Sequence, residues 1–365
     1  MATLVQAAEA SHSDALVVLK DGKLVGEWYF GKPQGPIEAM SVTKSVVSLA
    51  IGALMAEGKI KSIDEPLYAF YPEWKQGRKQ AVTLRHLLSH TSGLQNYPRT
   101  DVEIYPSPDF VQLALAAELT EEPGKAFAYN NKAVNLLAGV VQKAAGQRLD
   151  VYLREGLFKK MGITHFDWTL DQAGNPHGMS GLQVRPTDLA KLGQLMLQQG
   201  RWNGQQLLTP AWVTASKQAS QEVYPAYGLL WWLIPASTTY LIDQEQIGRL
   251  EAAGVKPEFV AKVRGLQGNY PDQAAYTLAL EKSFGKKYQR VLVEHIGHLD
   301  FALSKKKHGP IIGYSGRGDL GQYLVVYPSQ GLVAVRMVRG SDAYSEATDG
   351  FDDFERQVAQ LVKSR

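Results

Sequence analysis

The chain has 365 residues, 45% of them hydrophobic, so it is long enough to bury a large core in two or three lobes. A net charge of only +3 indicates neither a nucleic-acid partner nor a membrane-surface partner, and the apolar runs are too short to predict a membrane span. The absence of cysteine excludes disulfides and thiol catalysis, which fits an exported or a cytoplasmic protein alike.

Two alternating segments near the start of the chain predict a β-hairpin. Apolar side chains recur with a period of two over residues 15–20 and again over 24–30. The dipeptide Asp21-Gly22 between them is typical of a two-residue hairpin turn.

The next segment, Ser41-Val42-Thr43-Lys44, lies at the mouth of an apolar helical run over residues 45–56. Serine and lysine three positions apart lie on one face of a helix. A serine hydroxyl needs a base to become a nucleophile, and a lysine can serve if burial lowers its pKa. A helix N-terminus also favours developing negative charge. On this motif alone, Ser41 as a simple helix cap beside a solvated Lys44 stays open.

Helical patterns and loops dominate residues 61–200, and within them Tyr129-Asn130-Asn131 opens a second apolar helical stretch, 133–145. The phenol of Tyr129 can relay a proton, and the amide of Asn131 can donate to a substrate carbonyl or lie beside the lysine. The alternative is a buried tyrosine followed by a helix-capping asparagine.

Strand-like runs return at residues 227–234 and on both sides of Pro328. Strands at both ends and helices in the middle predict an α+β protein with several lobes. The expected division is a split α/β lobe, 1–60 with 201–365, around a helical lobe, 61–200. Within the α/β lobe, 236–307 is expected to be an insertion with helices near 244–253, 257–264 and 272–283.

The two motifs together resemble those of the serine β-lactamase and penicillin-binding-protein superfamily, in its class C β-lactamase, family VIII-type esterase and D-peptidase branch. The stretches 82–94, 180–182 and 185–193 also look like this branch. The resemblance runs from about Leu16 to Val338, less the insertion. It implies a β-lactamase/transpeptidase-like fold, in which helices flank an antiparallel sheet, an all-helical lobe is inserted, and Ser41 lies between the two.

In that superfamily a third motif, Lys-Thr-Gly or His-Thr-Gly, lies on an edge strand, and Tyr314-Ser315-Gly316 is the segment here that looks like it. Serine and glycine match, but Tyr314 replaces the cation that helps relatives to hold a substrate carboxylate. This departure favours an ester or amide without that carboxylate. Arg317 is the candidate for supplying the charge instead, and its backbone N–H is the expected second oxyanion donor.

Two competing interpretations concern other segments. Residues 316–321 fit the dinucleotide-binding pattern G-x-G-x-x-G, but a predicted hairpin follows where that fold needs a helix, so a nucleotide site is excluded. Glu294, His295, His298 and Asp300 cluster in sequence, but their order matches no metal motif and Gly297 interrupts the helix. No metal is therefore assigned. The run 305–308 is expected to be a solvated loop.

The resemblance implies acyl transfer through a covalent acyl-enzyme, with Ser41 as nucleophile and Lys44 and Tyr129 as the catalytic acid and base. The expected substrate-binding and oxyanion residues are Asn131, Tyr314, Ser315, Gly316 and Arg317. No cofactor is needed. The substrate is a small ester, amide or β-lactam, with esterase or amidase activity favoured.

Several alternatives remain at this point. The chain could be a β-lactamase or a D-alanyl-D-alanine-type carboxypeptidase. From a different class, it could be a penicillin-binding or sensor module without turnover. The insertion is either a lid over the substrate or a peripheral decoration or oligomer contact, so the oligomeric state stays open. No secretion signal is visible at the start. The resemblance favours a periplasmic or extracellular location if such a signal was removed, and a cytoplasmic one otherwise.

Overall fold

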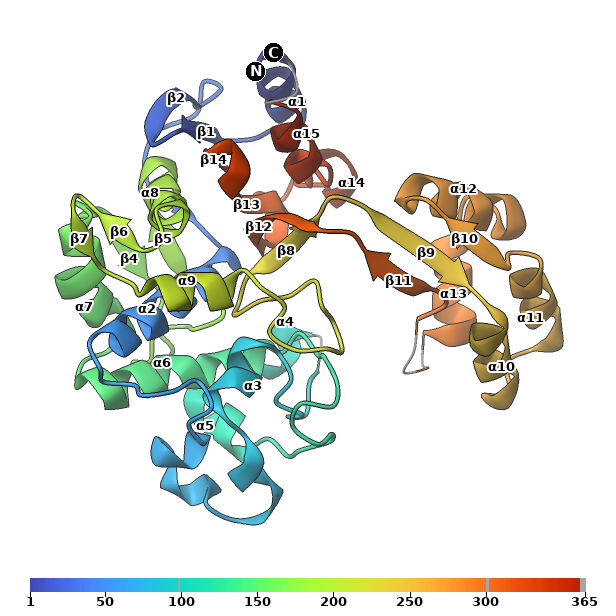
Figure 1. The fold of residues 1–365 in the computed structure, drawn as a ribbon, viewed down its shortest axis with the longest axis horizontal. Helices are drawn as coiled ribbons and strands as arrows, with labels where there is room; N and C mark the ends of the chain where they lie inside the picture. The colour runs from blue at the N-terminus through green and yellow to red at the C-terminus, as the bar shows by residue number, and fades with distance from the viewer. Residues whose placement is uncertain (98, 298, 300–301, 362–365) are drawn as a thin grey trace. The chain divides into compact units, whose positions relative to one another are not determined.

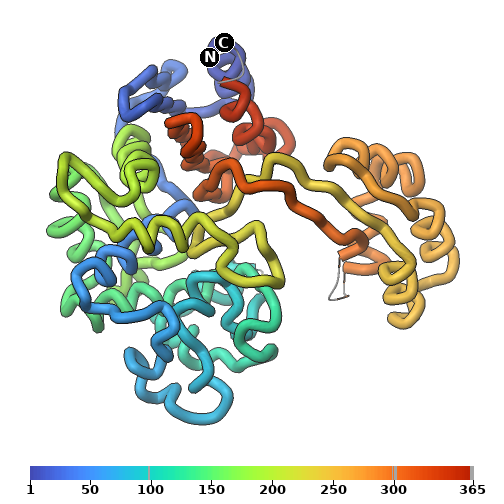
Figure 2. Tube along the Cα trace, in the orientation of Figure 1, coloured from blue at the N-terminus to red at the C-terminus, as the bar shows by residue number. Residues whose placement is uncertain are grey.

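The computed structural model describes residues 1–97, 99–297, 299 and 302–361 (Figures 1 and 2). The chain forms two compact units, one made of Met1–Ile234 and Gly313–Arg365 and the other of Pro235–Ile312. Each unit has a hydrophobic core of its own. Further division of the first unit into an α/β lobe and a helical lobe stays a prediction, as does the role of the second unit as a lid.

A six-stranded sheet is the centre of the first unit. The pairings of β1 with β2 and β14, and of β13 with β14 and β12, are antiparallel. The expected α+β class with an antiparallel sheet is therefore confirmed. In spatial order the strands are β2 (Lys23–Trp28), β1 (Ala15–Lys20), β14 (Leu332–Met337), β13 (Gln322–Tyr327), β12 (Ile311–Gly318) and β8 (Trp232–Pro235).

Both predicted hairpins are present. The turn between β1 and β2 places Asp21 and Gly22 at φ of 50° and 78°, the left-handed conformation that a two-residue hairpin turn requires. The hairpin of β13 and β14 follows residues 316–321, which confirms that this glycine-rich segment does not open a helix. The strand expected over 227–234 begins only at residue 232, because Leu230 is left-handed and the Gly228 N–H donates to the Trp231 carbonyl in a turn.

The two faces of the sheet are covered by different helices. A Cβ atom on Gly193 of α8 (Pro186–Leu197) would lie within 2.8 Å of Leu324 and Val333, so glycine lets this helix lie close against one face. On the other face, Tyr323 packs its ring 5.2 Å from that of Phe354, the first residue of α15 (Phe354–Gln360). Because side chains alternate along a strand, β12 also presents even-numbered residues to one face and odd-numbered residues to the other.

The remaining elements of the first unit are mostly helices. The described residues of 61–200 are mostly helices and loops, and they also contain two short strands, β4 and β5, which form a small sheet with β3. The other helices are α1 (Ala2–Ala10), α2 (Val42–Ala56), α3 (Leu84–Leu88), α4 (Thr100–Glu103), α5 (Phe110–Ala116), α6 (Asn131–Ala145), α7 (Leu149–Leu153), α9 (Pro210–Ser216) and α14 (Glu346–Asp349). Short turns of helix are η1 (Leu67–Ala69), η2 (Pro72–Trp74), η3 (Gly77–Ala81), η4 (Arg154–Phe158), η5 (Asp319–Gly321) and η6 (Pro328–Gln330). The short strands are β3 (Ile37–Glu38), β4 (Phe166–Trp168), β5 (Leu182–Val184), β6 (Arg201–Trp202) and β7 (Gln205–Gln206).

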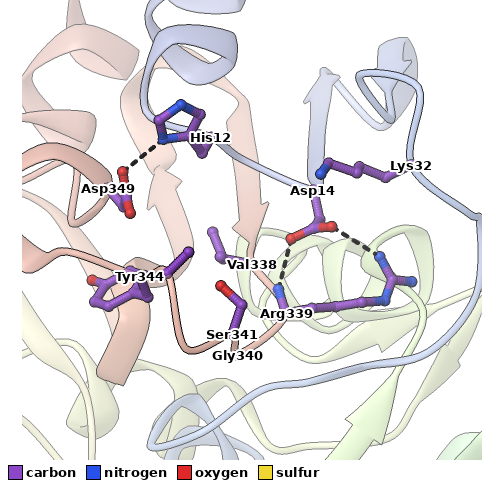
Figure 3. Close-up of a pocket in the computed structure, with 10 residues that line it drawn as sticks. His12, Asp14, Lys32, Val338, Arg339, Gly340, Ser341, Tyr344 and Asp349 are labelled. Carbon is purple, nitrogen blue, oxygen red and sulfur yellow. Dashed lines mark hydrogen bonds and ion pairs between the residues drawn. The ribbon is translucent and has the colours of Figure 1, made fainter.

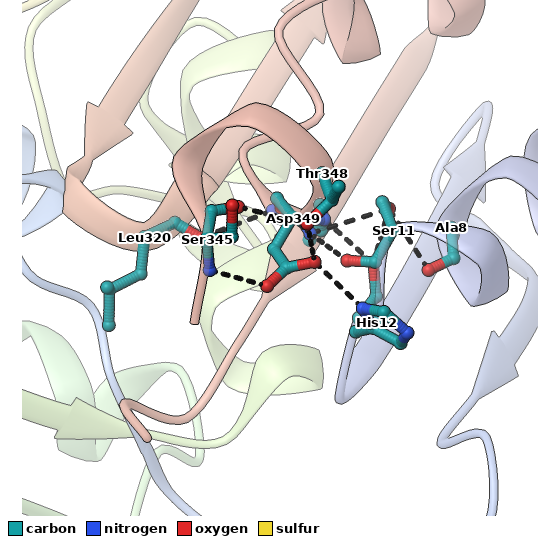
Figure 4. A network of polar contacts seen from close by, with 9 residues as sticks. Ala8, Ser11, His12, Leu320, Ser345, Thr348 and Asp349 are labelled. Atoms are coloured by element: carbon teal, nitrogen blue, oxygen red, sulfur yellow. Dashed lines mark hydrogen bonds and ion pairs between the residues drawn. The ribbon is translucent and has the colours of Figure 1, made fainter. Parts of the chain in front are cut away.

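A buried arginine on β14 joins the two ends of the chain. Arg336 is fully buried and donates to the carbonyls of Ser11, Gly321 and Asp349 and to the hydroxyl of Ser13. Burial lowers its pKa to about 10. The Asp349 carboxylate accepts from His12 at 2.8 Å, from Ser345 and from Thr348 (Figure 4). These contacts fasten α1 and α14 to the sheet.

In its described residues, the second unit has a three-stranded sheet, β10-β9-β11, and four helices. The expectation of a solvated loop at 305–308 is wrong, because these residues form β11 and pair with β9. Lys305 binds Asp243 and Glu245, and Lys306 lies over the Tyr240 ring. Lysines are common on such edge strands because their charge opposes further strand pairing. The elements are β9 (Thr238–Ile242), α10 (Gln244–Ala252), α11 (Pro257–Arg264), β10 (Gly268–Tyr270), α12 (Gln273–Phe284), α13 (Tyr288–Ile296) and β11 (Lys305–His308).

In the described part of the chain, no helix has both the length and the apolar character that a membrane crossing requires.

Candidate active site

Ser41 is the residue that caps α2, and the residue before it is strained. Met40 has φ of 45°, a left-handed conformation that is uncommon outside glycine and that collects at functional sites. The helix that follows is buried along almost its whole length because its sequence is nearly all apolar. This apolar run carries Lys44 into the core, where only 1% of the residue is exposed.

Lys44 lies directly beside Ser41. Its Nζ is 2.8 Å from Ser41 Oγ and donates to the Met179 carbonyl, also at 2.8 Å. Burial lowers the Lys44 pKa well below its usual value, and among the described residues no carboxylate pairs with the amine. A neutral amine that donates one N–H to Met179 keeps its lone pair for the Ser41 hydroxyl proton. The arrangement can therefore activate a serine.

Tyr129 completes this group from the start of α6. Its ring lies 4.9 Å from Lys44 Nζ, the atom that also contacts Ser41 Oγ. Burial raises the Tyr129 pKa to about 12. The structure thus brings together the three predicted catalytic residues, two from α2 and one from the loop before α6.

His90 supports Tyr129 from behind. The His90 Nδ1 accepts the Asn130 N–H at 3.1 Å, and its ring centroid lies 4.4 Å from that of Tyr129. Burial holds the His90 pKa well below its usual value, so the ring is neutral at neutral pH. The His90 ring packs against the Tyr129 ring and so helps to fix the position of the phenol. Asn130 caps α6 by accepting the Ala133 N–H, as the cap interpretation of this motif expected for an asparagine here.

The predicted third motif lies on β12, close to the start of α2. A Cβ on Gly316 would meet Val42 and the Ser45 hydroxyl at 2.9 Å, and one on Gly318 would lie 3.0 Å from the Ser41 nitrogen. Glycine at these two positions is what allows the strand to lie against the helix start. The backbone of residues 316–318 is therefore beside Ser41, where the second oxyanion donor, Arg317 N–H, is proposed.

The side chains of the motif have other partners. Tyr314 is 1% exposed and packs edge-on against Trp231 in the core, with ring centroids 5.5 Å apart. Ser315 donates to Glu355, and Arg317 forms a two-point ion pair with the same carboxylate. The Tyr314 phenol is thus held in the core, and a substrate-binding role for these side chains stays a prediction.

Asn131, the other predicted substrate-binding residue, donates from Nδ2 to the Thr100 hydroxyl at 3.2 Å. Its Oδ1 is buried and, within the described ranges, accepts no hydrogen bond.

The motifs did not identify four further residues of this region, which are Met179, Asn135, Trp232 and Glu355. The Met179 carbonyl is held towards Lys44 because Asn135 of α6 accepts the N–H groups of Gly178 and Met179. Trp232 stacks on Tyr129 with centroids 5.8 Å apart. Glu355 binds Arg317 from α15. Met179 directly precedes the 180–182 stretch, which is a usable signal, whereas nothing near Glu355 in the sequence marks it.

A separate pocket is lined by His12, Asp14, Lys32 and Tyr344, among others, and contains none of the predicted site residues (Figure 3). Asp14 accepts from the Arg339 side chain and backbone there, so its charge is compensated. No cluster of three metal-binding side chains occurs among the residues with described positions. Of the acidic and histidine group weighed for a metal, His298 and Asp300 lie outside the described residues.

Several known proteins are similar to this chain in sequence or in fold. Esterase EstB of Burkholderia gladioli is 32% identical over 128 residues, which are 30% of this chain and 32% of EstB. A Bacillus subtilis protein, "Putative penicillin-binding protein PbpX", is 25% identical over 186 residues, 48% of this chain and 46% of PbpX. The alignments thus span less than half of these relatives. The solved penicillin-binding protein of Bacillus halodurans superposes with a TM-score of 0.62 at 18% identity, covering 98% of both chains.

The structural similarity establishes the fold, a β-lactamase/transpeptidase-like one. The family model described as Beta-lactamase matches residues 1–353, nearly the whole chain. Members of this family are mostly serine hydrolases that act on small esters, amides or β-lactams, although some are not catalytic. The chain belongs to the Beta-lactamase family.

Proposed function

We propose that this protein is a serine hydrolase that cleaves a small ester or amide through a covalent acyl-enzyme. The observation that carries the proposal is the 2.8 Å contact between Ser41 Oγ and Lys44 Nζ, an amine whose pKa is lowered by burial. In the first step Ser41 Oγ attacks the carbonyl carbon while Lys44, with Tyr129, takes the hydroxyl proton. The same proton is delivered to the leaving group as its bond to the carbonyl carbon breaks.

The Ser41 and Arg317 N–H groups stabilise the oxyanion in this proposal. Water then attacks the acyl carbon while Lys44 and Tyr129 accept its proton. The same proton passes to Ser41 Oγ as the bond between Oγ and the acyl carbon breaks, which releases the acid and restores the Ser41 hydroxyl. Asn131 orients the substrate. The position of Gly318 beside the Ser41 nitrogen supports the assignment of the oxyanion donors, since it brings the backbone of β12 to the helix start.

An ester or amide is favoured over a β-lactam because Tyr314 takes the place of a cation and is buried in the core. EstB, the relative with the highest identity among those described above, is an esterase by name, which agrees with this preference.

The test is intact-mass spectrometry of wild type and Ser41→Ala, each incubated with a fluorophosphonate probe and with a penicillin. Turnover of p-nitrophenyl acetate and butyrate is measured in parallel. The expected result is a probe adduct and ester turnover in wild type alone, with no lasting penicillin adduct. A persistent penicillin adduct would indicate a penicillin-binding or sensor protein instead. Equal turnover by Ser41→Ala would refute the assignment of the nucleophile.

A further inference from the structure

Two side chains of β12 hold a carboxylate that belongs to the chain itself. Arg317 donates from Nε and Nη2 to the two carboxylate oxygens of Glu355, each at 2.7 Å. The Ser315 hydroxyl donates to the same group. Two-point pairing of this kind is the strongest way in which a protein binds a carboxylate. Three donors around one carboxylate amount to a complete binding site, with Glu355 as its occupant.

The ring of Trp232 contacts both this occupied site and Tyr129, one of the proposed catalytic residues. The Arg317 guanidinium lies 5.2 Å from the centre of the Trp232 ring, and Trp232 in turn stacks on Tyr129. The next residue along β12, Gly318, approaches the Ser41 nitrogen. A carboxylate on the acyl part of a substrate bound at Ser41 therefore has Arg317 as a nearby cation.

The charge of Arg317 is compensated before any substrate arrives. Glu355 is 15% exposed and Arg317 is 39% exposed, so the pair is partly shielded from water but not sealed in the core. Burial alone would lower the Arg317 pKa, but the Glu355 carboxylate outweighs it and raises the pKa, which keeps the guanidinium charged and paired. Tyr314, the first residue of the predicted third motif, is not a cation, so it adds no second positive charge beside Arg317.

We propose that Glu355 determines substrate charge preference: its carboxylate fills the Ser315–Arg317 site, so the enzyme selects acyl groups without a negative charge. The inference rests on the proposed function and names the substrate class within it. An acidic substrate has to displace the Glu355 carboxylate, which is part of the same chain and therefore has a high effective concentration. The negative charge of Glu355 also repels the negative charge of the substrate. A neutral acyl group meets neither obstacle.

The test compares two esters with the same leaving group, p-nitrophenyl butyrate and the mono-p-nitrophenyl ester of glutaric acid. The measured quantity is the ratio of kcat/KM for the acidic ester to that for the neutral one. This ratio does not depend on how much of a preparation is folded. In wild type the neutral ester is expected to be preferred. Glu355→Gln keeps an oxygen for Arg317 but removes the charge, and is expected to raise the ratio at least about tenfold.

Two variants separate this effect from a general loss of charge. Asp353→Asn removes a carboxylate from the start of the same helix, where Asp353 pairs with Arg356, and is expected to leave the ratio unchanged. The double variant Arg317→Gln/Glu355→Gln removes both charges. Its ratio of kcat/KM for the acidic ester to that for the neutral ester is expected to lack the rise seen in Glu355→Gln. A gain that survives in the double variant would overturn the role of Arg317.

The remaining outcomes also decide the matter. An unchanged ratio in Glu355→Gln, with Ser41-dependent hydrolysis of the neutral ester intact, would overturn this inference alone. No Ser41-dependent turnover of either ester would overturn the proposed function and the inference with it. If Glu355→Gln does not fold, Glu355→Asp withdraws the carboxylate by one methylene. An intermediate rise in the ratio then supports the proposal, and an unchanged ratio refutes it.

Discussion

Two lysines of the first unit are buried almost completely, and they differ in what surrounds the amine. Lys132, in the first turn of α6, forms an ion pair with Glu103. Lys44, in the first turn of α2, contacts a hydroxyl and a carbonyl, and no described carboxylate. Burial of an ammonium is costly unless a counter-charge compensates for it. The comparison teaches that a buried lysine becomes a candidate base where no counter-charge stands beside it: burial lowers the pKa of Lys44, which has no described carboxylate partner, and so favours its neutral form.

The largest expected effect comes from removing the unpaired lysine. Lys44→Met should lower kcat/KM for p-nitrophenyl butyrate about a thousandfold or more, because Ser41 loses its base. The variant should also unfold at a higher temperature at pH 7. A lysine whose folded pKa lies below its unfolded pKa lowers stability at neutral pH, and that penalty disappears as the pH rises past the unfolded value. Calorimetry beside the kinetics checks both parts, and a less stable Lys44→Met protein would contradict the neutral amine.

Tyr129→Phe should lower kcat/KM about a hundredfold, because the proton relay is lost while the ring still packs on His90 and Trp232. The control is the melting temperature, which is expected to stay close to that of wild type. A loss of less than about threefold would assign the whole relay to Lys44.

The pH dependence tests the protonation state of Lys44 directly. Its lowered pKa means that the amine becomes an active base below the usual range of lysine, so kcat/KM should rise with pH and then level off. Because the Tyr129 pKa is raised to about 12, no falling limb is expected below that pH. Lys44 and Tyr129 are close enough to titrate as a coupled pair. The pH at which kcat/KM rises therefore reflects the pair and not either residue alone. A rate that falls as the pH rises from 6 to 9 would be inconsistent with a neutral lysine base.

The smallest effect on rate is expected at the paired lysine. Lys132→Met should change kcat/KM less than about tenfold, but it leaves Glu103 without its partner and should cost about 3–5 kcal/mol of stability. The double variant Lys132→Met/Glu103→Gln should recover much of that loss, as measured by denaturant unfolding. A thousandfold loss of activity in a folded Lys132→Met protein would remove the distinction between the two lysines.

The fold class and the grouping of Ser41, Lys44 and Tyr129 could be predicted because the two motifs together resemble those of a known superfamily. Apolar periodicity identified α2 and α6, and both proposed catalytic motifs lie where those helices begin. What escaped prediction depends on contacts between distant segments. The pairing of Glu355 with Arg317 joins residues 38 positions apart on different elements. The charged run at 305–308 was misjudged because its pairing with β9 decides its structure.

The position of β1 inside the six-stranded sheet, between β2 and β14, has a consequence for how this protein is made. β1 spans residues 15–20, yet it pairs along its whole length with β14, which ends at Met337. A ribosome therefore releases a buried, apolar strand more than 300 residues before its partner exists. Until the last tenth of the chain is synthesised, that strand is a hazard for aggregation, and a chaperone that shields it during translation should raise the yield of folded protein.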